Sequence, residues 1–299
     1  MGIGRIVVVG QVARDLVLRV DCLPADGASA PVLERIERLG GKGANQAVGL
    51  SQLGRDVVLV GVVGDDDAGR MVLTDGRASG LDVEGVTLRG RTALMVDIVG
   101  AGGSRRLLED VPDEALIVAA DLDRAAGAIG SASTLSLQLQ QPLATLLAAV
   151  RLAPPDARVV LDGGAEGSEA EELLARADVL RADSAEAEMW AGTALTSVEV
   201  AEAAAGRLLA RGPDLVALAV PGRGDLVAWR GGSRFFPHSA AEVVDPTGAG
   251  DAFVAGLIAA LDEGAGPEEA GALGKAAATS TVGRLGGRPD LSGLGGRTG

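Results

Sequence analysis

The chain has 299 residues, which is long enough for one large domain or two modest ones, with an ample core. Hydrophobic residues make up 47% of it but aromatic residues only 2%, so the core must be built from Ala, Val and Leu. The formal net charge of −14 argues against a general affinity for nucleic acid, because phosphate binding needs clustered Lys and Arg. A small anionic ligand held by backbone N–H groups is still compatible with this charge.

The expected cellular location follows from the single cysteine, from the lack of a signal-peptide pattern and from the lack of a membrane-spanning run. Cys22 is the only cysteine, so no intrachain disulfide can form, which fits a reducing compartment. Residues 1–18 lack a basic-then-apolar signal with a small-residue cleavage site. No apolar run approaches the roughly 20 residues of a membrane span. We therefore expect a cytoplasmic protein with no membrane partner.

Predicted strands and helices alternate along most of the chain. The β-branched runs at 5–10 and 57–64 are typical of buried strands, and residues 44–54 predict a helix that ends at a glycine. Later the alternation is regular, and two Ala-rich helices follow at about 250–262 and 267–284. This order predicts a three-layer α/β fold, with a parallel-rich sheet and helices on both faces.

Three segments depart from that alternation. Residues 11–39 combine partial alternation with Pro and Gly, as in short strands joined by turns, and residues 91–110 predict a hairpin around GAGG. Both are too short for separate domains, so we predict a single domain over residues 1–299 with a small β flap. The Gly-rich end at 285–299 is expected to be a loose tail.

The sequence GGKGANQA at 40–47 allows two interpretations. Its glycines permit close backbone approach to a ligand, and Asn45 offers a donor and an acceptor, so the segment could hold the hydroxyls of a polyol. The same residues also fit a Gly-rich turn followed by a helix cap. The segment is not a Walker A loop, because Lys42 is followed by Gly43 rather than by Ser or Thr.

The sequence DPTGAGDAF at 245–253 precedes and opens the first Ala-rich helix. Such residues are common at helix starts for local backbone reasons alone. They can also form an anion site, since Gly248, Ala249 and Gly250 would present successive N–H groups at a helix N-terminus. A carboxylate beside a phosphoryl group is electrostatically unfavourable. A role as the base that takes the proton from an attacking hydroxyl would explain why Asp251 occupies this position.

Together, GGKGANQAVGLSQLG and DPTGAGDAFVAG resemble the two signature regions of the ribokinase-like (PfkB) sugar kinases in order and separation. The resemblance covers nearly the whole chain and includes LPADG, VGDDDAG, LQLQQP and DSAEAE. It implies a sheet flanked by helices, with a small β-sheet lid over the sugar. The implied reaction moves the γ-phosphoryl group of ATP to a sugar hydroxyl. Because GGKGANQA is closest in form to ribokinases, the implied sugar is ribose or a related pentose.

The resemblance also implies roles for individual positions. Asp251 matches the catalytic base of the family, and Gly248, Ala249 and Gly250 match its anion hole, which neutralises charge on the transferred phosphoryl group. The positions that match sugar contacts are Asp15, Gly41, Lys42, Asn45 and Gln140. The positions near the ATP nucleotide are Asp183, Gly222, Gly224 and Gly250.

Carboxylates at three positions match metal-linked sites of the family. Asp183 and Glu186 fall on its Asn-x-x-Glu motif, which is linked to the magnesium–phosphate site, so Mg²⁺ is an implied cofactor with Glu186 as a candidate ligand. The first position is Asp rather than Asn, which replaces a neutral group by a charged one. Asp245 lies where members that use a monovalent cation supply a ligand, so potassium is a further candidate.

Four positions depart from the ribokinase pattern. Ala13 stands where Asn is usual, and Gln140 stands where Glu is frequent. Near the nucleotide, Ala219 and Pro221 replace a common Thr and Gly, which removes a hydroxyl and a backbone N–H. These departures leave open a nucleoside kinase of the same family, or a weakly catalytic protein that senses sugars or nucleotides.

The predicted lid has two further features. Lids of this family often pair into dimers, and the apolar residues of LVLRV and ALMVDIV fit a homodimer through the lid. Arg105 and Arg106 lie in the predicted lid hairpin, where they could meet an anionic part of a substrate.

Overall fold

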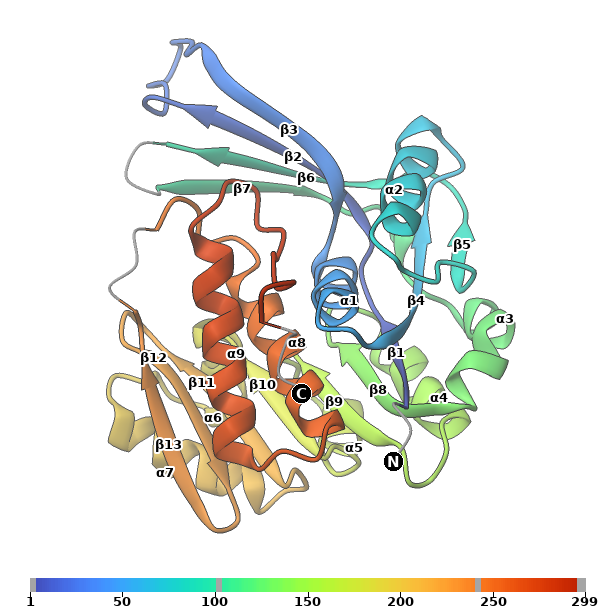
Figure 1. The fold of residues 1–299 in the computed structure, drawn as a ribbon, viewed down its shortest axis with the longest axis vertical. Coiled ribbons are helices and arrows are strands. Elements are labelled where there is room, and N and C mark those ends of the chain that lie inside the picture. Colours follow the sequence, from blue (N-terminus) through green and yellow to red (C-terminus); the bar gives the residue numbers. More distant parts are fainter. Residues whose placement is uncertain (1–3, 101–103, 240–242, 295–299) are drawn as a thin grey trace.

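The computed structural model describes residues 4–100, 104–239 and 243–294. In these ranges the chain forms a nine-stranded central sheet, helices on both of its faces and a separate four-stranded sheet (Figure 1). The predicted three-layer α/β fold with a small β-sheet lid is therefore confirmed. None of the helices in these ranges combines the length with the hydropathy that a bilayer crossing requires.

The central sheet has the strand order β13-β12-β11-β10-β9-β8-β1-β4-β5. Its strands are β1 (Arg5–Val9), β4 (Asp56–Val63), β5 (Val86–Leu88), β8 (Ala132–Gln138), β9 (Arg158–Asp162), β10 (Val179–Ala182), β11 (Leu215–Val220), β12 (Gly224–Trp229) and β13 (Gly232–Pro237). Neighbouring pairs from β5 to β11 are parallel, whereas β12 and β13 add antiparallel strands at one edge. The parallel strands therefore end at one edge of the sheet, where ligands bind in folds of this type.

Small aliphatic side chains pack the helices onto both faces of this sheet. One face is covered by α3 (Ala119–Ile129), α4 (Leu143–Leu152), α5 (Ser168–Leu174), α6 (Ser184–Ala191) and α7 (Val198–Leu209). The other face is covered by α1 (Lys42–Gln52), α2 (Asp67–Ala78), α8 (Ala249–Asp262) and α9 (Pro267–Val282). A short 3₁₀ turn spans Asp113–Ala115. Helix α8 packs between α1 and α9, and its residues from Asp251 to Ala260 are buried.

The second sheet, which we call the lid, has the order β3-β2-β6-β7. Its strands are β2 (Ala13–Val20), β3 (Val32–Gly40), β6 (Ala93–Val99) and β7 (Arg105–Asp110). They match the predicted flap segments, except that β3 extends one residue further, and part of the GAGG turn falls outside the described residues. Strand β2 follows β1, and β3 leads into α1, so the lid projects from the end of the central sheet at which β1 terminates (Figure 1).

The expectation of a loose C-terminal tail is wrong for residues 285–291. Leu291 is fully buried, and its backbone N–H donates a hydrogen bond of 2.8 Å to Gln52 Oε1 on α1. Arg288 Nη1 contacts both carboxylate oxygens of Asp75, at 2.8 and 2.9 Å. The Gly and Pro content of this segment is typical of loops, but contacts with distant residues fix its position.

Candidate active site

Two cavities adjoin at the start of α8. The lid cavity, of about 360 Å³, is lined by the lid, by α1 and by the first turns of α6 and α8. The α8–α9 cavity, of about 380 Å³, is lined by these two helices and by strands β11 to β13. Arg181, Pro246 and Gly250 line both cavities. A ligand in one cavity would therefore meet a ligand in the other at the N-terminus of α8.

Glycine shapes the helix start at this junction. Gly248 caps α8 in the left-handed region, with φ of 71°. A Cβ atom at this position would lie 1.8 Å from the carbonyl oxygen of Gly287, so only glycine fits. The N–H of Ala249 makes a long hydrogen bond of 3.4 Å to the Pro246 carbonyl oxygen. Residues 248–250, which we call the cradle, thus present a helix N-terminus, an arrangement that attracts anions.

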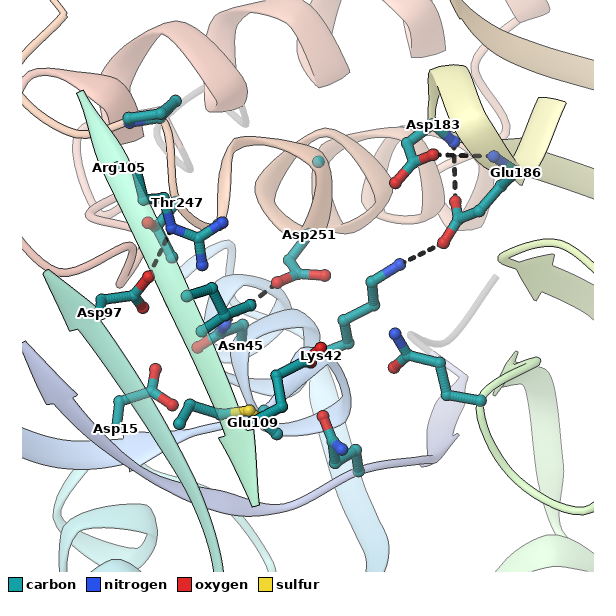
Figure 2. A pocket seen from close by; sticks show the side chains of 18 of the residues that line it. Asp15, Lys42, Asn45, Asp97, Arg105, Glu109, Asp183, Glu186, Thr247 and Asp251 are labelled. Carbon is teal, nitrogen blue, oxygen red and sulfur yellow. Dashed lines mark hydrogen bonds and ion pairs between the residues drawn. The ribbon is translucent and has the colours of Figure 1, made fainter. Parts of the chain in front are cut away.

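Asp251 lies in the first turn of α8, and its side chain reaches the lid cavity (Figure 2). The residue is 7% exposed, and its Oδ2 accepts a hydrogen bond of 3.0 Å from Asn45 Nδ2. Burial and the negative charge of Asp162 raise the pKa of Asp251 to about 6, although Lys42 and Asn45 oppose the shift. At neutral pH the group is therefore mostly ionised but more basic than an ordinary aspartate, which suits a general base.

Lys42 is held by a carboxylate at the start of α6. Its Nζ lies 2.6 Å from Glu186 Oε1. The other Glu186 oxygen accepts from the Asp183 N–H at 2.8 Å, and Asp183 Oδ1 accepts from the Glu186 N–H at 2.9 Å (Figure 2). Although burial disfavours the charge, the carboxylates of Asp162, Glu186 and Asp251 raise the pKa of Lys42. Lys42 is therefore a fixed cation within the lid cavity.

These contacts limit where a metal could bind. No group of three or more His, Cys, Asp and Glu side chains within the described ranges could hold a metal. Both oxygens of Glu186 are engaged, and one oxygen of Asp183 is bonded to the α6 backbone. Asp183 lines the lid cavity, and its second oxygen suits Mg²⁺, which typically binds one or two carboxylates together with substrate phosphates.

The lid turns a charged face toward its cavity. The pairing register places Asp15 opposite Met95 and Met95 opposite Glu109, and all three line the cavity. Asp97, which is 1% exposed, accepts a hydrogen bond from Arg105 Nε (Figure 2). Burial and the charge of Asp97 raise the pKa of Asp15 to about 7. Arg105 is therefore neutralised by the lid itself.

Asp245 is fully buried and holds the loop before the cradle. Its Oδ1 accepts hydrogen bonds from the N–H and hydroxyl of Thr247, at 2.9 and 2.6 Å. Its Oδ2 accepts a bond of 2.8 Å from the N–H of Gly286. Asp245 is not among the residues that line the two cavities, and a potassium ion beside it stays a prediction.

Most of the residues selected from the sequence lie together. The lid cavity is lined by Asp15, Gly41, Lys42, Asn45, Gln140, Asp183, Glu186, Gly248, Gly250 and Asp251, and the α8–α9 cavity by Ala249 and Gly250. The structure does not bring Gly222 and Gly224 to either lining: Gly222 lies in the turn between β11 and β12, and Gly224 is the first residue of β12. A Cβ at position 224 would lie 2.1 Å from the Phe236 carbonyl oxygen, so this glycine permits close strand packing.

Sequence reasoning missed Arg181 and Asp97. Arg181 lies in the apolar strand β10, lines both cavities and donates from Nη1 to Asp162 Oδ1 at 3.2 Å. Asp97 lies at a buried position of the alternating strand β6. Charged residues are rarely buried without a partner, so a charge inside an apolar strand was the available signal in both places.

Comparison with known proteins identifies the family. The profile of the pfkB family carbohydrate kinases matches residues 4–292. The chain is 26% identical to a ribokinase of Haemophilus influenzae, covering 95% of this chain and 94% of the relative. It is 31% identical to an ATP-dependent ribose-1-phosphate kinase of Halopiger xanaduensis, again covering 95% of this chain and 94% of the relative. The solved structure of Arabidopsis thaliana ribokinase with ribose and ATP has a TM-score of 0.79 to this chain, at 25% identity over 98% of each. The chain therefore belongs to the pfkB family of carbohydrate kinases, phosphotransferases with an alcohol group as acceptor, and has their ribokinase-like fold.

Proposed function

We propose that the protein is an ATP-dependent sugar kinase that phosphorylates a hydroxyl of an uncharged pentose, with ribose as the first candidate. The observation that carries this proposal is the position of Asp251, beside the cradle and at the junction of two adjoining cavities. The sugar would occupy the lid cavity and the nucleotide the α8–α9 cavity, so that the γ-phosphoryl group lies at the cradle.

In the proposed reaction, the acceptor hydroxyl oxygen attacks the γ-phosphorus and its proton passes to the Asp251 carboxylate. A new O–P bond forms while the bond from the γ-phosphorus to the β,γ-bridging oxygen breaks, and ADP leaves with that electron pair. The cradle would stabilise charge on the transferred group through backbone N–H donors and the helix dipole. Mg²⁺, held by the nucleotide phosphates and the free oxygen of Asp183, would neutralise part of that charge.

The charges of the lid cavity favour an uncharged acceptor over a sugar phosphate. Among the basic side chains of this cavity, Lys42 is already paired with Glu186, Arg105 with Asp97 and Arg181 with Asp162. The carboxylates of Asp15 and Glu109 also line this space. A second phosphate here would meet net negative charge, which disfavours binding. Hydroxyl groups, in contrast, can donate to these carboxylates.

The decisive experiment is turnover with a panel of acceptors. ADP release would be measured with ATP, Mg²⁺ and, in turn, ribose, other pentoses, hexoses, nucleosides and ribose 1-phosphate. We expect ribose or another free pentose to be phosphorylated best. Nucleosides are the rival acceptors, because Ala13 and Gln140 depart from the ribokinase pattern. Lack of turnover with every acceptor would favour the sensing alternative over a kinase.

Asp251→Asn tests the proposed base. We expect kcat to fall by about 10²–10⁴-fold, while the sugar still binds by calorimetry. Asp262→Asn is the matched control, because Asp262 lies at the other end of α8 and pairs with Arg55 at 3.4 Å. The control should retain kcat. Full activity of Asp251→Asn would exclude Asp251 as the base.

We also propose that potassium activates the enzyme through the loop that Asp245 holds. Asp245 precedes the cradle by three residues, so a cation bound there would add positive charge next to the anion site. Replacement of potassium chloride by tetramethylammonium chloride at equal ionic strength should lower kcat. Equal rates in the two salts would exclude this effect.

We further propose that the lid pairs with the lid of a second copy. The face opposite the lid cavity carries half-exposed apolar residues, among them Leu16, Leu18, Val96 and Ile98, together with Leu108, which is 61% exposed. Sedimentation should show a dimer, and Leu108→Glu should shift it toward monomer. A wild-type monomer at micromolar concentration would contradict this arrangement.

A further inference from the structure

We propose that Arg181 is a catalytic residue that contacts the phosphoryl group during its transfer, as an arginine supplied by the enzyme's own sheet. This inference rests on the proposed kinase reaction and adds a participant to it. Neither signature motif contains Arg181, which lies in the third position of β10.

The position of the side chain is the first observation. Within the described ranges, Arg181 is the only basic residue that lines both the lid cavity and the α8–α9 cavity. A Cβ atom built on Gly250 would lie 2.5 Å from Arg181 Nη2, so the guanidinium packs directly against the cradle backbone. Any side chain larger than hydrogen at position 250 would displace it. The glycine of the cradle therefore makes room for this cation.

The second observation is how the guanidinium is held. Nη1 donates to Asp162 Oδ1 at 3.2 Å, and Asp162 Oδ2 accepts a bond of 2.7 Å from Gln46 Nε2. Gln46 Oε1 in turn accepts bonds from Ser136 Oγ at 3.1 Å and Gln138 Nε2 at 2.8 Å. Asp162 is fully buried and is not part of either cavity lining. This buried series of hydrogen bonds fixes the Nη1 side of the guanidinium, while Nη2 faces the cradle.

The third observation is charge. A guanidinium keeps its protons in proteins, and here it is paired with the fully buried carboxylate of Asp162. Arg181 is therefore a fixed cation beside the cradle. A planar fork of this kind matches phosphate oxygens well, and it needs no reorganisation when their charge increases.

These observations give Arg181 a defined task. While the bond to ADP breaks and the sugar O–P bond forms, negative charge spreads over the equatorial oxygens of the phosphoryl group. Arg181 would donate hydrogen bonds from Nη2 to that charge and retain all of its own protons. Arginines placed in this way in other phosphoryl-transfer enzymes raise kcat by about 10³–10⁵-fold.

The rival explanation is purely structural, with Arg181 only neutralising Asp162 and Asp225. The two explanations differ in what they predict for ligands with and without a γ-phosphate. A structural arginine would affect ATP and ADP affinity equally, in step with stability. A catalytic arginine would affect kcat and the affinity for a γ-phosphate analogue, and leave ADP affinity nearly unchanged.

The test compares Arg181→Met and Arg181→Lys with the wild type. The matched control is Arg55→Met, because the Arg55 side chain is also 8% exposed and also pairs with a nearly buried aspartate, Asp262. The measurements are kcat, the melting temperature, and the dissociation constants of ADP and of the β,γ-imido analogue of ATP. All measurements use the full chain with Mg²⁺.

We expect Arg181→Met to lower kcat by at least about 10²-fold. The kcat of Arg181→Lys should lie between that of Arg181→Met and that of the wild type. The imido analogue should bind about tenfold more weakly to Arg181→Met, while the dissociation constant of ADP changes less than about threefold. Arg55→Met should lower the melting temperature and keep kcat. Arg181→Met with kcat within about threefold of wild type, or with parallel loss of both nucleotides, would overturn the inference. A wild type that phosphorylates no acceptor would refute the kinase proposal, and the two dissociation constants would still decide whether Arg181 contacts the γ-phosphate.

Discussion

Asn45 Nδ2 donates a hydrogen bond of 3.0 Å to Asp251 Oδ2, although the two residues are 206 positions apart in the sequence. Asn45 belongs to GGKGANQA and Asp251 to DPTGAGDAF, so this bond joins the two motifs directly. It also fixes the orientation of the carboxylate and stabilises its ionised form. The motif that was interpreted as a sugar contact therefore also tunes the proposed base.

The first prediction concerns the pH dependence of turnover. Because the base must be ionised, kcat/KM should rise with pH through about 6, the pKa of Asp251, and reach a plateau above it. Asn45→Ala removes a hydrogen bond that lowers this pKa, so its acidic limb should move to higher pH. The acidic limb of the pH–rate profile can be located by measuring initial rates between pH 5 and 8. A limb that moves to lower pH, or stays fixed, would contradict the tuning role.

The second prediction concerns stability. The pKa of Asp15 is raised from 3.8 to about 7, so the folded state binds this proton more tightly than the unfolded state. The stability gained from that proton is complete below about pH 4 and is lost as the pH rises through about 7. Asp15→Asn stays neutral, so at pH 8 it should be more stable than the wild type, by at most about 4 kcal/mol.

Urea unfolding at pH 5 and pH 8 measures this effect, and the gain should be much larger at pH 8. The same variant should bind ribose more weakly, since it loses an acceptor in the lid cavity. An equal stability difference at both pH values would show that the titration of Asp15 is not responsible.

The third prediction compares the two ends of α8. Gly248 and Gly264 both have positive φ, of 71° and 84°, but an added Cβ meets Gly287 at the first position and nothing within 4 Å at the second. Gly264→Ala should cost about 1–2 kcal/mol of unfolding free energy, through backbone conformation alone. Gly248→Ala should cost more and should also abolish turnover. Equal unfolding free energies for the two variants would argue against the close contact at Gly248.

The fourth prediction concerns acceptor choice. Asp97 neutralises Arg105 at the sugar end of the lid cavity, so Asp97→Asn should leave a cation available for an anionic substrate. The ratio of kcat/KM for ribose 1-phosphate to that for ribose should rise by about tenfold or more, since a charge-assisted bond is worth roughly 1.5–3 kcal/mol. Glu84→Gln is the control, because Glu84 lies outside both cavity linings. An unchanged ratio would mean that Arg105 does not face the acceptor.

Local patterns were sufficient to predict the fold and the start of α8. Apolar runs and Ala-rich periodic segments predict the strands and helices, and DPTGAGDAF predicts a helix start, which the structure places at Ala249. The close contact of Gly248 with Gly287 was not predicted, because it depends on the position of the C-terminal segment. The Arg181–Asp162 pair could not be predicted, because it depends on the parallel register of β9 and β10. The pairing of Asp97 with Arg105 depends likewise on the lid register. Composition alone was misleading for residues 285–291, whose position is set by contacts with distant parts of the chain.

The C-terminal segment also determines when the site can first exist during synthesis. Leu285 accepts a bond of 2.7 Å from Arg38 of the lid, Gly286 holds Asp245, and Gly287 packs against Gly248. These residues are translated after all the strands of both sheets and after all the helices that the structure describes. A nascent chain can therefore form the strands and helices of both layers before it completes the cradle, and catalytic competence would arrive only after residues 285–287 are translated. A chain that ends before position 285 should be inactive, because the contacts that hold Asp245 and Gly248 are then missing.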